Sequence, residues 1–174
     1  MEIILAENHG FCYGVKRAVE MANEAADGKG KSYTLGPIIH NPQVVGRLES
    51  KGVSPIQEVA DIDEGTMIIR SHGVGPAIYA EAEEKGLHIL DATCPHVKKA
   101  QQDAKSVIED GMTLVILGEK NHPEVKSINL WANNKGIIIE DEESAKKLQI
   151  VEKMGVVVQT TFSQFKFNSI IEIL

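Results

Sequence analysis

Short apolar runs alternate along this chain with segments of helical pattern, and four of the helices begin at a proline. Proline suits the first helical position, where no backbone N–H is needed. The predicted strands are residues 1–6, 32–35, 66–70, 88–90, 113–117, 137–139 and 156–158. The predicted helices are residues 15–26, 42–51, 76–85, 95–110, 123–133, 142–148 and 164–174. This alternation predicts an α/β fold with mostly parallel sheets, right-handed crossovers and helices on both faces.

The length of the chain, 174 residues, is enough for one large or two small α/β units. Apolar residues make up 43% of the sequence and aromatic residues only 5%, so the expected core is aliphatic. No linker rich in Gly, Pro or Ser divides the chain. We place the boundary between the two units at the helix that follows Cys94. This predicts two small three-layer α/β/α modules, residues 1–95 and 96–174.

The charge distribution argues against a nucleic-acid partner. The net charge is −7, with 8 basic and 14 acidic side chains in residues 1–95 and 10 and 11 in the remainder. No basic stripe of the kind that binds nucleic acid is present. No apolar run reaches the length of a membrane span, and the N-terminus has no basic region typical of a signal peptide. We therefore expect a cytoplasmic protein without a membrane segment.

Two cysteines, Cys12 and Cys94, lie 82 positions apart. A structural disulfide is not expected in a cytoplasmic chain, and the absence of Cys-x-x-Cys excludes zinc ribbons and thioredoxin-type motifs. Cys94 stands between a predicted strand and Pro95, where a helix begins, and the N–H groups of that helix would lower the pKa of the thiol. Such a thiolate is a nucleophile or a metal ligand. A buried free cysteine is the third interpretation that this stretch alone leaves open.

Unusual polar residues follow the predicted strands, one loop after another. In open α/β sheets, ligands bind outside the carboxyl ends of the strands, so the fold would bring these loops to one surface. The residues are Cys12, His40, His72, Cys94, His122 with Glu124, and Gln159 with Thr160 and Thr161. Six loops that each carry a candidate are a stronger signal than any one of them.

Three histidines near helix N-termini suit an anion such as diphosphate, and Gly73 would let the backbone approach it closely. Each residue also has a purely structural interpretation. His40 could hydrogen-bond its own turn, and an acid such as Glu124 is favoured in any first helical turn. The chain lacks the glycine-rich phosphate-binding motifs of the common nucleotide-binding folds. Two thiols suit a soft metal or an iron–sulfur cluster, but two ligands alone do not complete the coordination of either.

The loops also carry short motifs in a fixed order. They are residues 10–18 (GFCYGVKRA), 37–41 (PIIHN), 70–74 (RSHGV), 91–95 (DATCP), 122–125 (HPEV) and 159–161 (QTT). Together they resemble the signatures of the LytB/IspH family, the 4-hydroxy-3-methylbut-2-enyl diphosphate reductases. The resemblance extends over nearly the whole chain.

This resemblance implies three similar α/β modules around a central 4Fe–4S cluster. It also implies an oxidoreductase of the non-mevalonate pathway of isoprenoid biosynthesis. The enzyme takes two electrons, from a donor such as ferredoxin or flavodoxin, and removes the hydroxyl group of its substrate as water. The products are isopentenyl and dimethylallyl diphosphates.

The resemblance also implies roles for individual residues. Cys12 and Cys94 match ligands of the cluster. The residues that match the diphosphate-binding set are His40, His72 and His122. Glu124 matches the acid that delivers a proton near the cluster, and Thr160 belongs to its hydrogen-bond network.

The chain departs from the family pattern at its C-terminal end. The third cluster cysteine of the family, and a Ser-Ser-Asn-type segment that grips the diphosphate, lie downstream of the Gln-Thr-Thr motif. This sequence ends at Leu174, before both. We therefore expect the first two modules of a three-module enzyme, with no intact cluster and little or no reductase activity alone. The face carrying Cys12, Cys94 and Glu124, left bare by the absent third module, is then a candidate for self-association.

Two other functions remain open at this point. One is a non-catalytic diphosphate-binding or interaction module derived from the reductase. The other is a zinc hydrolase that uses Cys12, Cys94 and one histidine as ligands, although the closely paired ligand spacing usual for zinc is absent.

Overall fold

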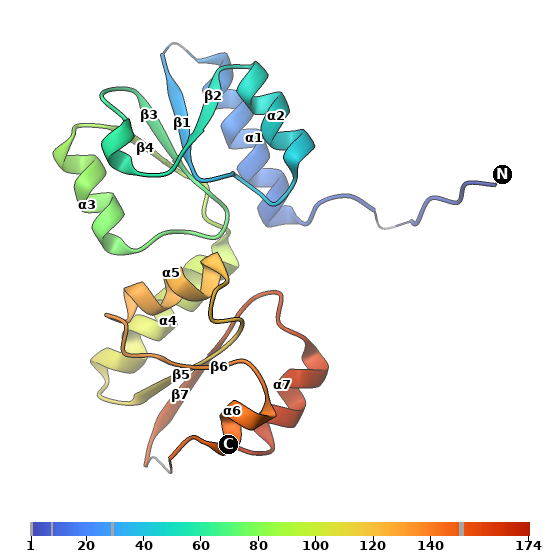
Figure 1. The fold of residues 1–174 in the computed structure, drawn as a ribbon, viewed down its shortest axis with the longest axis vertical. Coiled ribbons are helices and arrows are strands. Elements are labelled where there is room, and N and C mark those ends of the chain that lie inside the picture. Colours follow the sequence, from blue (N-terminus) through green and yellow to red (C-terminus); the bar gives the residue numbers. More distant parts are fainter. Residues whose placement is uncertain (1, 8, 29, 150–151) are drawn as a thin grey trace.

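The predicted alternation folds into two separate parallel sheets (Figure 1). The computed structural model describes residues 2–7, 9–28, 30–149 and 152–174. The first sheet has the order β2-β1-β3-β4 and consists of β1 (Ser32–Leu35), β2 (Val53–Ile56), β3 (Thr66–Ile69) and β4 (His88–Asp91). The second has the order β6-β5-β7 and consists of β5 (Thr113–Leu117), β6 (Ile137–Ile139) and β7 (Met154–Val158). All strand pairs among the described residues are parallel, which confirms the predicted α/β class.

Helices cover both faces of each sheet. On the first sheet they are α1 (Tyr13–Asp27) and α2 (Pro42–Ser50) on one face, and α3 (Pro76–Glu84) with the short 3₁₀ helix η1 (Val59–Asp61) on the other. On the second sheet they are α4 (Pro95–Glu109) and α5 (Pro123–Trp131) on one face, and α6 (Glu142–Lys146) and α7 (Gln164–Ile171) on the other. We refer to α1 through β4 as the first half and to α4 through α7 as the second half.

The core is aliphatic, as the composition predicts. In β3, Ile68 faces α1 and α2, whereas Met67 and Ile69 face α3, and all three side chains have 0% exposure. In β5, Leu114 and Leu117 likewise pack toward opposite faces. Strands buried on both faces explain why these runs are continuously apolar rather than alternating.

The prediction of a first strand over residues 1–6 is wrong. Residues 2–6 form an extended segment without a strand partner in the described part of the chain, and it runs away from the first sheet (Figure 1). Ile3, Ile4 and Leu5 are 74–83% exposed. An apolar run becomes a strand only where a neighbour takes up its N–H and C=O groups, and neither edge strand of the first sheet does so. Met1 lies outside the described residues.

One strand was not predicted. The strand β2 contains Pro55, which has no N–H to donate to a sheet and so weakens any prediction of a strand. It lies at the edge of the first sheet, where it pairs only with β1. Helix α5 ends at Trp131, before the predicted residue 133, because Asn133 adopts a left-handed conformation with φ 53°.

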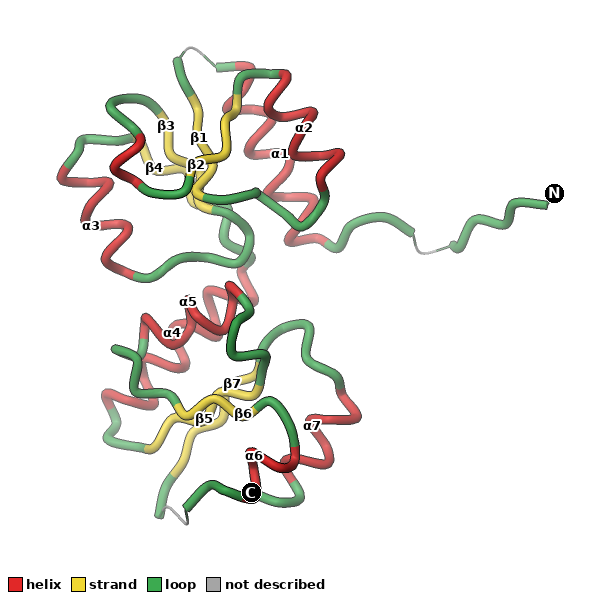
Figure 2. The backbone as a smooth tube through the Cα atoms, in the orientation of Figure 1, coloured by secondary structure: helices red, strands yellow, loops and turns green. Residues whose placement is uncertain are grey.

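The two halves follow one another directly, with β4 leading through residues 92–94 into α4. The loops at the carboxyl ends of β1 and β3 lie at the end of the first half that faces α4 and α5 (Figure 2). Within the described ranges, none of the helices combines the length and the apolar composition that crossing a membrane requires.

Candidate functional site

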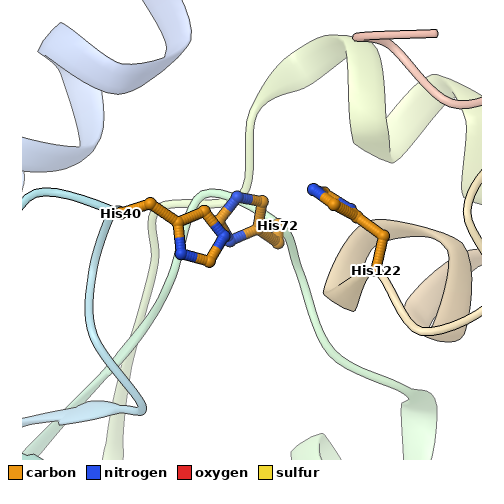
Figure 3. A group of neighbouring side chains, drawn as sticks. All are labelled: His40, His72 and His122. Carbon is orange, nitrogen blue, oxygen red and sulfur yellow. The ribbon is translucent and has the colours of Figure 1, made fainter.

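Three histidines from three different loops gather at the boundary between the halves. His40 follows β1, His72 follows β3 and His122 follows β5 (Figure 3). The ring centroids of His40 and His72 are 4.6 Å apart, and those of His72 and His122 are 5.4 Å apart. The first half supplies two of these rings and the second half the third, so the cluster exists only where the halves meet.

Helix caps fix two of these loops, those of His40 and His122. His40 precedes Asn41, the N-cap of α2, whose side chain accepts a hydrogen bond from the backbone N–H of Val44 at 3.0 Å. His122 is itself the N-cap of α5, and its Nδ1 accepts a hydrogen bond from the backbone N–H of Glu124 at 3.2 Å. Because Nδ1 is an acceptor there, the neutral ring carries its proton on Nε2, which is free for a ligand.

His72 is neutral at physiological pH. Its pKa is lowered from 6.5 to about 4, first by burial and then by the positive charges of His40, Arg70 and His122. Its Nδ1 is a buried atom without a hydrogen-bond partner in the described part of the chain. A buried ring nitrogen without a partner, beside the charged Arg70 guanidinium, is a place where an anion would be stabilised.

Arg70 is a charged neighbour of this cluster that our sequence reasoning did not single out. Burial lowers the pKa of its guanidinium, yet arginine stays protonated in proteins. A Cβ atom at Gly36 would lie 2.8 Å from Arg70 Nη1, so the side chain runs against the backbone of the loop that follows β1. The sequence feature that could have identified Arg70 is its position in the motif of residues 70–74, directly before Ser71 and His72.

Glu124 is buried in the first turn of α5, with 2% exposure. Its Oε1 accepts a hydrogen bond of 2.6 Å from the backbone N–H of Thr160, and its Oε2 accepts one of 2.8 Å from the Thr160 hydroxyl. Thr160 is exposed and lies in the loop after β7. The carboxylate is therefore held in a fixed orientation by one residue that also reaches solvent.

Gln159 and Thr161 support the loops around this pair. The side-chain carbonyl of Gln159 accepts a hydrogen bond from the backbone N–H of Glu119 at 2.9 Å, and its amide donates to Thr161 Oγ1 at 2.9 Å. The first bond ties the loop after β7 to the loop after β5, and the second lies within the loop after β7. Of the three residues in the Gln-Thr-Thr motif, Thr160 is the one that contacts Glu124.

Cys94 lies against the start of the helix that Cys12 caps. Cys12 is the N-cap of α1, Cys94 is the N-cap of α4, and both thiols are free. A Cβ atom at Gly14 would lie only 2.5 Å from Cys94 Sγ, so the Cys94 thiol rests directly on the first turn of the helix that Cys12 caps. This contact joins two segments that are far apart in the sequence. Glycine at position 14 leaves room for it, because it has no Cβ atom.

Arg17 holds the Cys94 turn in place, and our sequence reasoning missed it as well. Its guanidinium donates hydrogen bonds to the carbonyl of Thr93 at 3.2 Å and to that of Asp91 at 3.4 Å. The backbone N–H of Cys94 donates to the carbonyl of Ser71 at 2.9 Å, which links the turn to the loop that carries His72. The thiols and the histidines therefore belong to one connected group of loops.

The three imidazoles also form the group of possible metal ligands found in the described residues, with ligand atoms within 4.8 Å of one another. Nitrogens that share a tetrahedral zinc ion lie about 3.3 Å apart, given Zn–N bonds of about 2.0 Å. This group contains no cysteine. It therefore gives no support to the hypothesis of a zinc ion bound by Cys12, Cys94 and a histidine.

Comparisons with known proteins agree with one another. A family model described as LytB protein matches residues 3–174. The chain is 48% identical over 172 residues to the 4-hydroxy-3-methylbut-2-enyl diphosphate reductase of Geotalea uraniireducens, covering 99% of this chain and 61% of that protein. It is 50% identical over 163 residues to the protein of that name from Geobacter metallireducens, covering 94% of this chain and 58% of that protein.

Two solved structures are also similar. One, an (E)-4-hydroxy-3-methyl-but-2-enyl diphosphate reductase, has a TM-score of 0.83 and 44% identity over 98% of this chain and 63% of that one. The other, the E-1-hydroxy-2-methyl-but-2-enyl-4-diphosphate reductase from Plasmodium falciparum, has a TM-score of 0.91 and 32% identity over 97% of this chain and 54% of that one. The chain thus spans about 60% of the length of the relatives it matches.

Proposed function

The chain belongs to the LytB family, and from this we propose that it forms the diphosphate-binding and proton-donating part of a 4-hydroxy-3-methylbut-2-enyl diphosphate reductase. The family that its motifs resemble is thereby confirmed. The observation that carries the proposal is the histidine cluster, in which loops from both halves converge beside Arg70.

His40, His72 and His122 bind the diphosphate group of the substrate in this proposal. Neutral His72 donates one ring N–H to a phosphate oxygen, and the Arg70 charge supplies long-range attraction. His40 and His122 stand at the N-terminal ends of α2 and α5, where helix dipoles favour negative charge. Binding from several directions would fix the orientation of the remaining part of the substrate.

Glu124 serves as the acid that protonates the leaving hydroxyl. A proton on Oε2 faces the hydroxyl of Thr160, and Thr160 as a residue is exposed, so it offers a path between the buried carboxyl group and the substrate. The Thr160 N–H keeps Oε1 occupied, which leaves Oε2 as the oxygen that exchanges the proton. A positioned acid of this kind suits general acid catalysis.

Cys12 and Cys94 are proposed ligands of an iron–sulfur cluster, which supplies the two electrons of the reaction when it is bound. Thiolates at two adjacent helix N-termini fit this role, and glycine at position 14 keeps the space around the Cys94 thiol open. Two thiolates are only part of such a ligand set. An electron donor such as ferredoxin or flavodoxin belongs to the same proposal, as does a cytoplasmic location.

We further propose that residues 1–95 and 96–174 act as two modules of this enzyme. Two exposed aromatic residues, Phe11 and Tyr13, flank Cys12 in the sequence. Their exposure supports the proposal that the chain self-associates or is covered by further protein.

A non-catalytic diphosphate-binding module is the second candidate function. The observation that favours it is the difference between the two parts of the site. The anion-binding part has three imidazoles close together beside the charged Arg70. The cluster-binding part has only the two cysteines of this sequence.

Calorimetry with the diphosphate substrate on the cluster-free chain tests the shared binding step. We expect binding that weakens about tenfold in His40→Ala and in His72→Ala, because each loses a hydrogen bond to a charged group. His88→Ala is the matched control, since His88 is an exposed histidine in β4. Equal affinity in all the variants, or no binding by the wild type, would refute the proposal. Uptake of iron and inorganic sulfide on anaerobic reconstitution, even without turnover, would favour the reductase part over the non-catalytic module if it is lost in Cys12→Ala and Cys94→Ala.

A further inference from the structure

Helix α5 is fixed to the loop that carries His72 by two hydrogen bonds from successive turns. Ser127 Oγ donates to the backbone carbonyl of His72 at 2.8 Å, and Trp131 Nε1 donates to the backbone carbonyl of Val74 at 2.9 Å. Ser127 and Trp131 are four residues apart and therefore lie on one face of α5. Both donors belong to the second half and both acceptors to the first half.

The backbone of this loop touches the helices directly. A Cβ atom at Gly73 would lie 2.4 Å from Gln101 Nε2, and one at Gly75 would lie 2.8 Å from Leu130 Cβ. There is no space for a side chain at either position. Close packing against α4 and α5, as well as hydrogen bonds, therefore holds the loop in place.

Gln101, on α4, completes the contact. Its Nε2 donates to Ser127 Oγ at 3.2 Å, and both side chains are buried, with 3% and 2% exposure. The Ser127 hydroxyl lies within reach of two carbonyls, that of His72 at 2.8 Å and that of Glu124 at 2.9 Å. The hydroxyl has one hydrogen to donate, and its donation to His72 links the loop of a proposed substrate-binding residue in the first half to the helix of the proposed acid in the second.

We propose that Ser127, Gln101 and Trp131 are positioning residues, which we call the seam latch, and that they hold His72 opposite His122. The inference rests on the proposed function, because the histidines from the two halves must face one diphosphate group together. None of the three latch residues belongs to the histidine cluster. They act through the loop of residues 72–75, whose position sets the 5.4 Å separation of the His72 and His122 rings.

The alternative is that these buried hydrogen bonds contribute only to stability. Ser32→Ala separates the two interpretations, because Ser32 is also a buried serine whose hydroxyl donates to a backbone carbonyl, that of Ala25 at 3.3 Å. That bond lies within the first half, away from the seam. A general loss of stability would act alike in Ser32→Ala and Ser127→Ala, whereas a loss of positioning would appear only in the latter.

Trp131 is the one tryptophan of the sequence, so its indole N–H gives a single NMR signal that reports on the seam. In Ser127→Ala we expect faster hydrogen exchange of this N–H and an inorganic pyrophosphate Kd raised about five- to tenfold. In Ser32→Ala we expect the wild-type Kd and the wild-type indole signal. Trp131→Phe, which keeps an aromatic ring but removes the donor, should raise the Kd as Ser127→Ala does.

The latch is refuted if Ser127→Ala leaves the indole exchange rate unchanged, or if Ser32→Ala changes the exchange rate and the Kd equally. A wild-type chain that does not bind pyrophosphate would refute the proposed function instead. In that case the exchange rate alone decides whether the latch holds the two halves together.

Discussion

Acidification should destabilise this protein through His72. The pKa of His72 is lowered to about 4 in the folded chain, by burial and then by the charges of His40, Arg70 and His122, against an ordinary value of 6.5. Between these two values the unfolded chain binds a proton that the folded chain excludes. Stability is therefore greatest above pH 6.5 and is lost as the pH falls toward 4.

The size of the effect follows from the two pKa values. Linkage between proton binding and folding gives a loss of about 2 kcal/mol between pH 7 and pH 5, and about 3 kcal/mol once the pH is below both values. Such a loss is a large part of the total for a small protein, since folded domains are stable by only about 5–15 kcal/mol.

Urea unfolding at several pH values between 4.5 and 7.5, with and without pyrophosphate, provides the measurement. His72→Gln should flatten the pH dependence by about 2.5 kcal/mol over this range, whereas His88→Gln, at an exposed position, should leave it unchanged. A bound anion offsets the neighbouring positive charges and raises the His72 pKa, so pyrophosphate should also flatten the curve. Parallel curves for the wild type and His72→Gln would refute the reasoning.

Three further perturbations test other parts of the site. Thr160→Val should lower the free energy of unfolding by about 1–3 kcal/mol in urea titrations, because one buried oxygen of Glu124 loses its donor. Thr161→Val, which affects only a neutral amide, should cost less. Gly14→Ala should destabilise by about 1–3 kcal/mol, despite the better helix propensity of alanine, because the new methyl group meets the Cys94 thiol. Adding Cys94→Ala should reverse that loss, and a strictly additive double mutant would show that no such contact exists. Anaerobic reconstitution of this chain should give no stable, substrate-reducing 4Fe–4S species by visible absorption and turnover, because the sequence holds only two cysteines.

Local pattern was sufficient to predict most of the fold. The strands β5 and β6 match the predicted ranges of residues 113–117 and 137–139, because each is a short apolar run bounded by turn residues. The starts of α2, α3, α4 and α5 match as well, since a proline marks each first position. In these places local preference and the tertiary fold agree.

The errors occur where a distant partner decides the outcome. Residues 2–6 have the composition of a strand but no partner in the described chain, and β2 has a partner despite its proline. Arg17 and Arg70 lie in motifs, yet nothing local indicates that one binds the Cys94 turn and that the other lies beside His72. Such roles depend on contacts between segments far apart in sequence.

Gly73 illustrates the same limit and sharpens the model of the site. The sequence alone favours the interpretation that Gly73 lets the backbone approach a ligand. In the structure it has φ +72° and faces Gln101, so glycine is required both by the left-handed backbone and by the packing of α4 against the loop. Each sheet orients its own loops, but neither sheet fixes how the two halves are placed. That placement depends on the contact of residues 73–75 with α4 and α5, which is why a substitution at this seam should affect anion binding without touching the anion.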